Sequence, residues 1–186
     1  MDNFTIFFNL GWRHILEGYD HLLFLTGLVI VTTSWRSLLK VISAFTIAHS
    51  TTLVLCSLGI ISLDARITET LIAASIAYVG IENVVRKKYD SRWIISGSFG
   101  LIHGAGFSGH LTDLLKAMLG AGNVWSPLLG FNLGIELGQI IAISIIFPFI
   151  WLMRKFKKED VLIPELSRAI AAVGIVLIVW RIWGFE

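Results

Sequence analysis

Charged residues are scarce in this sequence: Asp, Glu, Lys and Arg together make up 15% of its 186 residues, whereas 55% are hydrophobic. A soluble domain typically carries about 25% charged residues. A soluble domain of this length also has too little interior to bury so much apolar surface. The scarcity of charge therefore excludes an ordinary water-soluble enzyme and a disordered chain. We expect one all-α transmembrane domain over residues 1–186, with a lipid bilayer around it and no nucleic-acid partner.

Cysteine and proline are also rare. The single cysteine, Cys56, excludes an internal disulfide and any metal site built from several thiolates. The three prolines and 17 glycines are compatible with closely packed membrane helices. A basic region is missing from the N-terminal residues, so we expect no cleaved signal peptide there.

Long apolar runs are what the sequence does contain. A helix needs about 20 residues to cross a bilayer. Six runs approach or exceed this length, at roughly residues 14–33, 37–58, 65–85, 92–111, 127–151 and 168–183. The sequence therefore predicts six transmembrane helices. Residues 4–12 are apolar but short, and we expect them to lie in the membrane interface before the first span.

Lys and Arg residues are distributed unevenly between the two ends of these spans. Of the 15 in the chain, 11 fall in the first, third and fifth connections. Loops rich in Lys and Arg stay in the cytoplasm. These three connections are therefore predicted to be cytoplasmic and both termini outside. The expected location is a bacterial-type inner (plasma) membrane.

Ionisable side chains inside the spans are the main functional signal, because each costs about 2.5–3.5 kcal/mol to insert. Four of them lie about 10–14 Å below the outer ends of their spans, at 1.5 Å per residue: His21, His49, His103 and Glu136. His14 and Asp20 accompany them in the first span. Imidazoles and carboxylates in one layer suit a borderline divalent cation such as Ni²⁺, Co²⁺ or Zn²⁺.

Other roles for these polar residues stay open. A membrane histidine on its own more often makes an interhelical hydrogen bond than it binds a metal. Asp20 is either a metal ligand or the hydrogen-bond acceptor of a ligating imidazole.

The two halves of the chain carry a faint repeat. His14 and His103 are 89 residues apart, and His49 and Glu136 are 87 residues apart. An offset of about 88 residues divides the chain into three plus three spans, and an odd number of spans per half gives an inverted repeat. Inverted repeats are typical of secondary transporters, which bind their substrate near the repeat interface.

Four segments, in chain order, resemble the HupE/UreJ family of membrane proteins. They are HILEGYDHLLF at residues 14–24, FTIAHSTTL at 45–53, HGAGF at 103–107 and NLGIELGQ at 132–139. The resemblance implies a hydrogenase- or urease-accessory membrane protein that acts as a nickel or cobalt permease. It also implies a set of metal-site residues, namely His14, Asp20, His21, His49, His103 and Glu136.

Three functions remain open at this point. In the first, a permease carries a divalent transition metal, nickel or cobalt before zinc, through this site. In the second, a membrane-embedded hydrolase uses a His-ligated zinc-type ion to activate water. In the third, the chain is a non-catalytic membrane partner or metal sensor. We expect the permease rather than an enzyme. The direction of transport and the oligomeric state, a homo-oligomer included, stay open.

Overall fold

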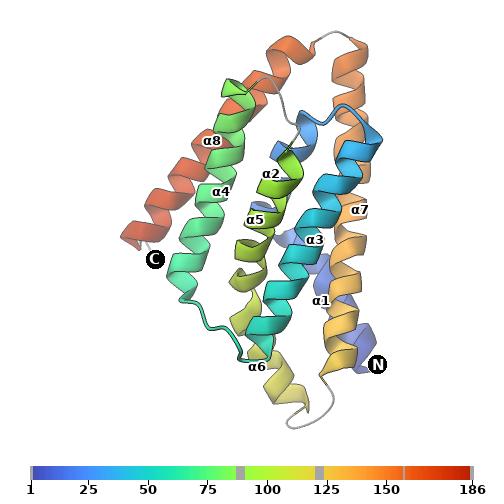
Figure 1. The fold of residues 1–186 in the computed structure, drawn as a ribbon, viewed down its shortest axis with the longest axis vertical. Coiled ribbons are helices and arrows are strands. Elements are labelled where there is room, and N and C mark those ends of the chain that lie inside the picture. Colours follow the sequence, from blue (N-terminus) through green and yellow to red (C-terminus); the bar gives the residue numbers. More distant parts are fainter. Residues whose placement is uncertain (1, 87–90, 120–123, 157, 185–186) are drawn as a thin grey trace.

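The computed structural model describes residues 2–86, 91–119, 124–156 and 158–184, and these ranges contain helices and no strand (Figure 1). The eight helices are α1 (Asn3–Glu17), α2 (Tyr19–Ile30), α3 (Trp35–Ser57), α4 (Ala65–Val85), α5 (Arg92–Gly106), α6 (Ser108–Leu119), α7 (Trp125–Lys155) and α8 (Glu159–Trp183). The expectation of an all-α fold is confirmed for the described part of the chain.

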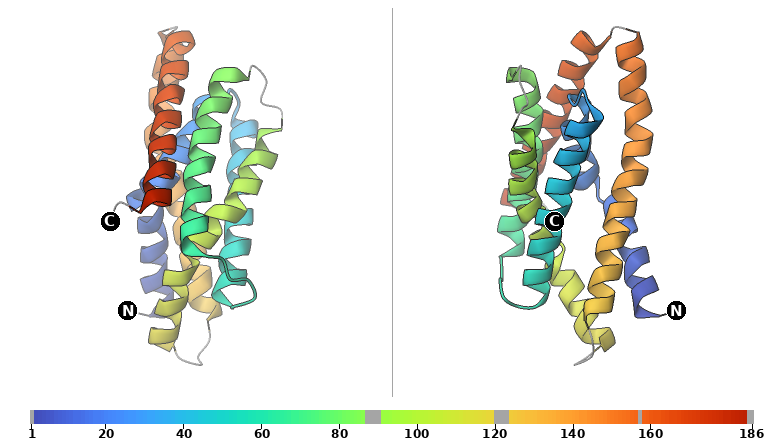
Figure 2. Two further views of the ribbon diagram at one scale, coloured as in Figure 1. Left: turned by 90° about the vertical axis from the view of Figure 1, so that its left-hand side faces the viewer. Right: turned by 45° about the vertical axis from the view of Figure 1, so that its right-hand side comes forward.

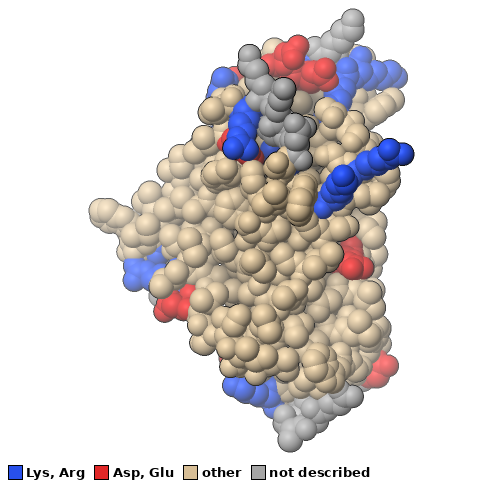
Figure 3. Space-filling model, viewed as in Figure 1, with Lys and Arg blue, Asp and Glu red and all other residues tan. Residues whose placement is uncertain are grey.

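Three of the helices, α3, α7 and α8, are each long and apolar enough to cross a membrane. Large apolar side chains such as Ile94, Ile140, Ile145 and Phe149 are exposed on the outside of the bundle. In Figure 3 most of the visible charged side chains lie toward the two ends of the molecule, and the surface between them is broadly uncharged. This surface fits a chain that is surrounded by lipid.

The first predicted span differs from the structure. The sequence predicts one helix over residues 14–33, whereas the chain forms two helices separated by Gly18, whose backbone is extended (φ −79°, ψ 92°). The segment expected in the membrane interface, residues 4–12, belongs to α1 and packs into the bundle, with Phe7 fully buried. The helix starts early because the Asp2 side chain accepts a hydrogen bond from the Thr5 N–H, which caps its first turn.

The fourth predicted span is interrupted as well. The sequence predicts a helix over residues 92–111, whereas α5 ends at Gly106 and α6 continues from Ser108 at an angle to it (Figure 1). Phe107 forms the joint between the two helices. Two broken helices, α1–α2 and α5–α6, therefore run through the bundle.

Three pairs of helices pack along their length: α1 with α7, α3 with α5, and α4 with α8. The first two pairs are parallel and the third is antiparallel (Figures 1 and 2). Glycines allow the closest approaches. A methyl group on Gly11 would overlap the carbonyl oxygen of Phe131, and one on Gly100 would lie 2.6 Å from the carbonyl oxygen of Phe45.

Two apolar clusters lie one above the other in the bundle. One contains Phe24, Phe45 and Ile76, contributed by α2, α3 and α4. The other contains Leu53 and Phe131, from α3 and α7. On α3, His49 lies one helical turn from Phe45 on one side and one turn from Leu53 on the other. A polar layer is thus enclosed between two apolar ones.

Candidate metal centre

Three histidines from three helices meet in this polar layer. His14 is in the last turn of α1, His21 is in the first turn of α2, and His49 is in the middle of α3. Each offers one ring nitrogen, and these three nitrogens lie within 4.8 Å of one another. The break at Gly18 allows the first two rings to meet edge to face, with their centroids 4.6 Å apart.

The distances between these nitrogens fit a site that closes around a metal ion. A tetrahedral site with metal–nitrogen bonds of about 2.1 Å separates its ligand nitrogens by about 3.4 Å. The observed separations, all within 4.8 Å, exceed this value by at most about 1.4 Å.

Burial and hydrogen bonding set this cluster apart from an ordinary helix contact. His49 is completely buried, and neither of its ring nitrogens has a hydrogen-bond partner among the described residues. The Nε2 atom of His21 is in the same situation. A buried polar group without a partner costs about 1–3 kcal/mol. The unpartnered nitrogens of His21 and His49 fit a site whose partner is a metal ion.

A fourth imidazole, that of His103 on α5, lies beside the cluster. Its ring centroid is 5.0 Å from that of His21. The hydroxyl of Ser75 donates to the carbonyl oxygen of Ile72 at 2.7 Å and lies 2.9 Å from His103 Nε2. Because the hydroxyl has only one proton, Nε2 carries the hydrogen of the His103–Ser75 bond, and the lone pair is on Nδ1. Nδ1 is buried and without a partner in the described part of the chain, so it is the fourth candidate ligand atom.

The two predicted carboxylates do not join the cluster. Asp20 forms an ion pair with Arg181 on α8, with Oδ2 2.6 Å from Nη2. Glu136 is exposed on α7. One turn further along α7, Gln139 is buried instead and accepts a hydrogen bond of 2.7 Å from the Thr46 hydroxyl. Of the predicted set of six residues, the four histidines thus lie together, Asp20 lines the cavity beside them but is paired with Arg181, and Glu136 is exposed.

A cavity of about 930 Å³ leads from the surface to the cluster. His14, His21 and His103 form part of its wall, and Asp20, Glu69, Arg66 and Arg181 also line it. Its aromatic lining includes Tyr19 and Trp183, which are exposed. In Figure 2, α8 ends part-way along the bundle near the junction of α1 and α2. Residues at this end of α8, Arg181 and Trp183 among them, line the cavity.

The sequence analysis did not assign a role to several residues of this site. Arg181 was only counted among the basic residues, and Ser75, in the middle of a span, was expected to make a helix–helix contact without a link to the metal site. Phe107 was noted within a motif only. Its ring centroid is 4.2 Å from that of His14, and it stacks on Phe131 at an interplanar angle of 3°. A polar residue in the middle of a span, such as Ser75, is the signal that could have indicated a partner for a ligand.

Comparison with known families decides the affiliation of the chain. A family model described as HupE / UreJ protein matches residues 1–185. The chain belongs to the HupE/UreJ family. No curated protein and no solved structure matches it. In this HupE/UreJ chain the four clustered histidines all come from the motif segments on which the resemblance rests, at residues 14–24, 45–53 and 103–107.

Proposed function

We propose that this HupE/UreJ protein transports a divalent transition-metal cation across a bilayer, nickel or cobalt first and zinc as the further candidate. The observation that carries the proposal is the convergence of imidazole nitrogens from separate helices at the inner wall of a cavity that opens to the surface. Imidazole is a preferred ligand of nickel, copper and zinc. The metal is the cargo, and the histidines take the place of its water ligands.

The helix arrangement supports transport. We propose that the chain is an inverted repeat of three plus three spans, in which α1–α2, α3 and α4 correspond to α5–α6, α7 and α8. Gly11 packs on the carbonyl of Phe131 as Gly100 packs on that of Phe45, and each glycine lies three residues before a histidine. Broken helices at the interface of inverted repeats are typical of secondary transporters.

A buried polar network closes the other half of the bundle. Arg92 donates to the carbonyl oxygen of Gly27 at 2.9 Å and to Asn83 Oδ1 at 2.7 Å, and its Nη1 lies 3.3 Å from Glu82 Oε2. Asn83 also donates to the Gly27 carbonyl, at 2.8 Å. These bonds tie α4 and α5 to the second half of α2. In our proposal the cation leaves the cluster only when this network opens.

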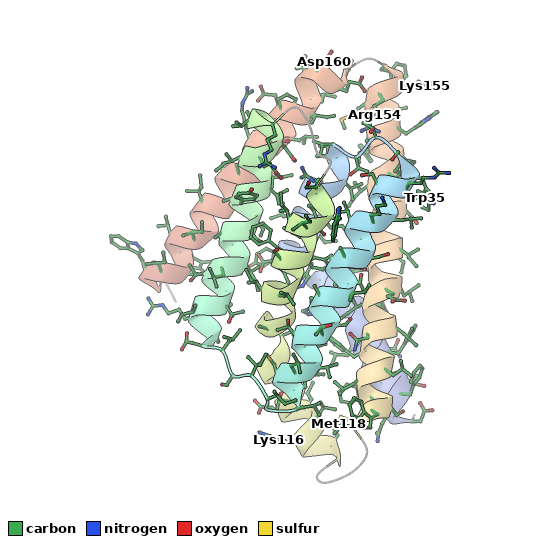
Figure 4. The ribbon with its side chains drawn as sticks, viewed as in Figure 1. Trp35, Lys116, Met118, Arg154, Lys155 and Asp160 are labelled. Atoms are coloured by element: carbon green, nitrogen blue, oxygen red, sulfur yellow. The ribbon has the colours of Figure 1, made fainter. Side chains whose placement is uncertain are left out.

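We propose that the end of the bundle with this network faces the cytoplasm and that both termini face outside. Figure 4 shows Arg154 and Lys155 at one end of the bundle and Lys116 at the other. The ends of α2, α4 and α7 and the beginnings of α3, α5 and α8, which flank the three connections rich in Lys and Arg, lie toward the first of these ends (Figure 1). The positive-inside rule then makes it the cytoplasmic end. The cavity opens on the other side, so the cation enters from outside.

A membrane-embedded hydrolase is the less favoured function. It would use a carboxylate near the metal as general base. Of the two candidates, Asp20 is bound to Arg181, and Glu136 is exposed on α7. We therefore propose a transporter rather than an enzyme.

Uptake into proteoliposomes tests this function. Purified protein is reconstituted into vesicles that contain a metal-sensitive dye, and Ni²⁺, Co²⁺, Zn²⁺ and Mg²⁺ are added outside in turn. We expect saturable uptake of at least one of the first three ions and none of Mg²⁺, which prefers oxygen ligands. Uptake no faster than that of protein-free vesicles for all four ions, from folded protein, would contradict the proposal.

A further inference from the structure

A positive charge lies in the wall of the cavity through which we propose that a cation enters. Arg181, near the end of α8, has only 9% of its side chain exposed. Its guanidinium contacts two acidic residues. Nη2 is 2.6 Å from Asp20 Oδ2, Nη1 donates to the backbone carbonyl of Glu69, and Nε is 3.9 Å from Glu69 Oε2. An arginine at this place repels a dication, so its presence needs an explanation.

The charges that line the cavity cancel. Arg66 and Arg181 contribute two positive charges, and Asp20 and Glu69 contribute two negative charges. These four side chains therefore add no net charge to the wall that a dication passes on its way to the histidines. A carboxylate that exchanged its arginine for the metal would attract the dication directly.

Asp20 is placed for such an exchange. Its side chain lines the same cavity as His14, His21 and His103. Only Oδ2 binds Arg181, while Oδ1 is buried and has no hydrogen-bond partner among the residues described. A rotation of the Asp20 side chain would break one ion pair and add a carboxylate ligand.

Glu69 is placed to receive the guanidinium. Its carboxylate is already near Nε of Arg181, and 55% of its side chain is exposed, so it can adjust its position. Arg66 donates to the backbone carbonyls of Arg181 and Ile182. The end of α8 is therefore held to α4 while the Arg181 side chain changes partner.

We propose that Arg181 is a positioning residue that holds Asp20 when no metal is present and moves to Glu69 when the metal binds Asp20. This inference rests on the proposed function, because it assumes that the histidine cluster binds a divalent metal. Arg181 then lowers the affinity of the site for the cation and speeds its release. It acts through Asp20 and does not touch the metal itself.

The direction in which Arg181→Gln changes the Kd for Ni²⁺ distinguishes this role from a purely structural one. In Arg181→Gln, Asp20 loses its competing partner and the site loses a nearby positive charge. We expect the Kd for Ni²⁺, measured by titration of the purified full-length protein, to fall by about tenfold, within the usual range of coupling between linked equilibria. In vesicles we expect KM and kcat to fall together, because release slows. An arginine that only held the helices together would weaken metal binding when removed.

A second substitution tests the receiving partner. Glu69→Gln leaves the displaced guanidinium without its alternative carboxylate, so we expect the Kd for Ni²⁺ to rise by about fivefold. In the double variant with Arg181→Gln, the Glu69 substitution should have no further effect. Arg181→Lys keeps the charge and should bring the Kd back toward the wild-type value. The matched control is Arg168→Gln, which removes an exposed ion pair with Glu165 on the same helix and should leave the Kd unchanged.

The outcomes are distinguishable. An unchanged or higher Kd for Ni²⁺ in folded Arg181→Gln overturns the inference. A rise in Kd caused by Glu69→Gln in the double variant with Arg181→Gln overturns it as well. If Arg181→Gln does not fold, Glu69→Gln decides alone, because 55% of the Glu69 side chain is exposed and we expect the fold to tolerate its substitution. Wild-type protein that binds no metal at all would instead contradict the proposed function. Binding without uptake would contradict transport and still allow the exchange at Arg181 to be measured.

Discussion

Replacement of His49 by leucine is expected to abolish both metal binding and metal uptake while leaving the metal-free protein at least as stable as the wild type. The His49 side chain is completely buried, and both of its ring nitrogens lack a partner in the described part of the chain. Leucine removes two buried polar atoms whose missing hydrogen bonds cost about 1–3 kcal/mol each. It also fills most of the volume next to Phe45, so no large cavity forms.

Thermal unfolding in detergent and Ni²⁺ titration measure the two effects on the same preparation. Thr51→Ala is the matched control, because Thr51 lies on the exposed face of α3 and its hydroxyl only donates to the carbonyl oxygen of Ile47. This variant should bind metal like the wild type. If His49→Leu lost several kcal/mol of stability and still bound metal, the histidine layer would serve helix packing and not a metal ion.

Arg92→Ala is expected to destabilise the protein by about 3–5 kcal/mol, the cost of breaking a buried ion pair from one side. The Arg92 side chain is 2% exposed and contacts Glu82, Asn83 and the Gly27 carbonyl. Its removal leaves buried oxygens without a donor and opens a hole between α2, α4 and α5.

The neighbouring Arg86 provides the control. It binds the same carboxylate, with Nη1 2.9 Å from Glu82 Oε1, but 55% of its side chain is exposed. Arg86→Ala should therefore cost only about 0–1 kcal/mol. Both variants can be compared by denaturant unfolding, followed by tryptophan fluorescence. Equal stability of the two variants would mean that the network around Arg92 does not hold this half of the bundle together.

The depth of the histidines could be predicted from the sequence, because depth follows from counting residues along apolar runs of known rise. His21, His49 and His103 were expected in one layer, and their side chains do lie together. Their encounter also depends on the break at Gly18. This break was not predicted, because the polar residues beside it, Glu17 and Asp20, were interpreted as functional residues within one continuous helix. At the break the backbone of Gly18 is extended, and residue composition alone does not predict this conformation.

The position of Glu136 shows what a depth count cannot supply. Counting predicts its depth along the span but says nothing about which face of α7 turns inward. That face is the one with Gly134 and Gly138, which pack against α1. Glu136 is two residues from each glycine, which is about 200° around the helix. The positions of Gly134 and Gly138 in the sequence therefore predict that Glu136 points away from α1.

The partner of Asp20 could not have been predicted locally. Arg181 is 161 residues away in sequence and belongs to the last helix. Their contact depends on how α8 packs against α4 and where α8 ends beside the α1–α2 junction, which is a property of the assembled bundle. Asp20 forms an ion pair with Arg181 in the structure, and its role as a metal ligand stays a prediction.

The central claim is that the clustered imidazoles hold a divalent metal, and X-ray absorption at the nickel edge tests it most directly. Purified protein is saturated with Ni²⁺, dialysed and analysed for metal content and for the atoms that surround the metal. The account predicts one nickel per chain, with three or four imidazole nitrogens at about 2.1 Å and loss of this signal in His49→Leu. A nickel content far below one per chain, or a shell of oxygen atoms without imidazole, would contradict it.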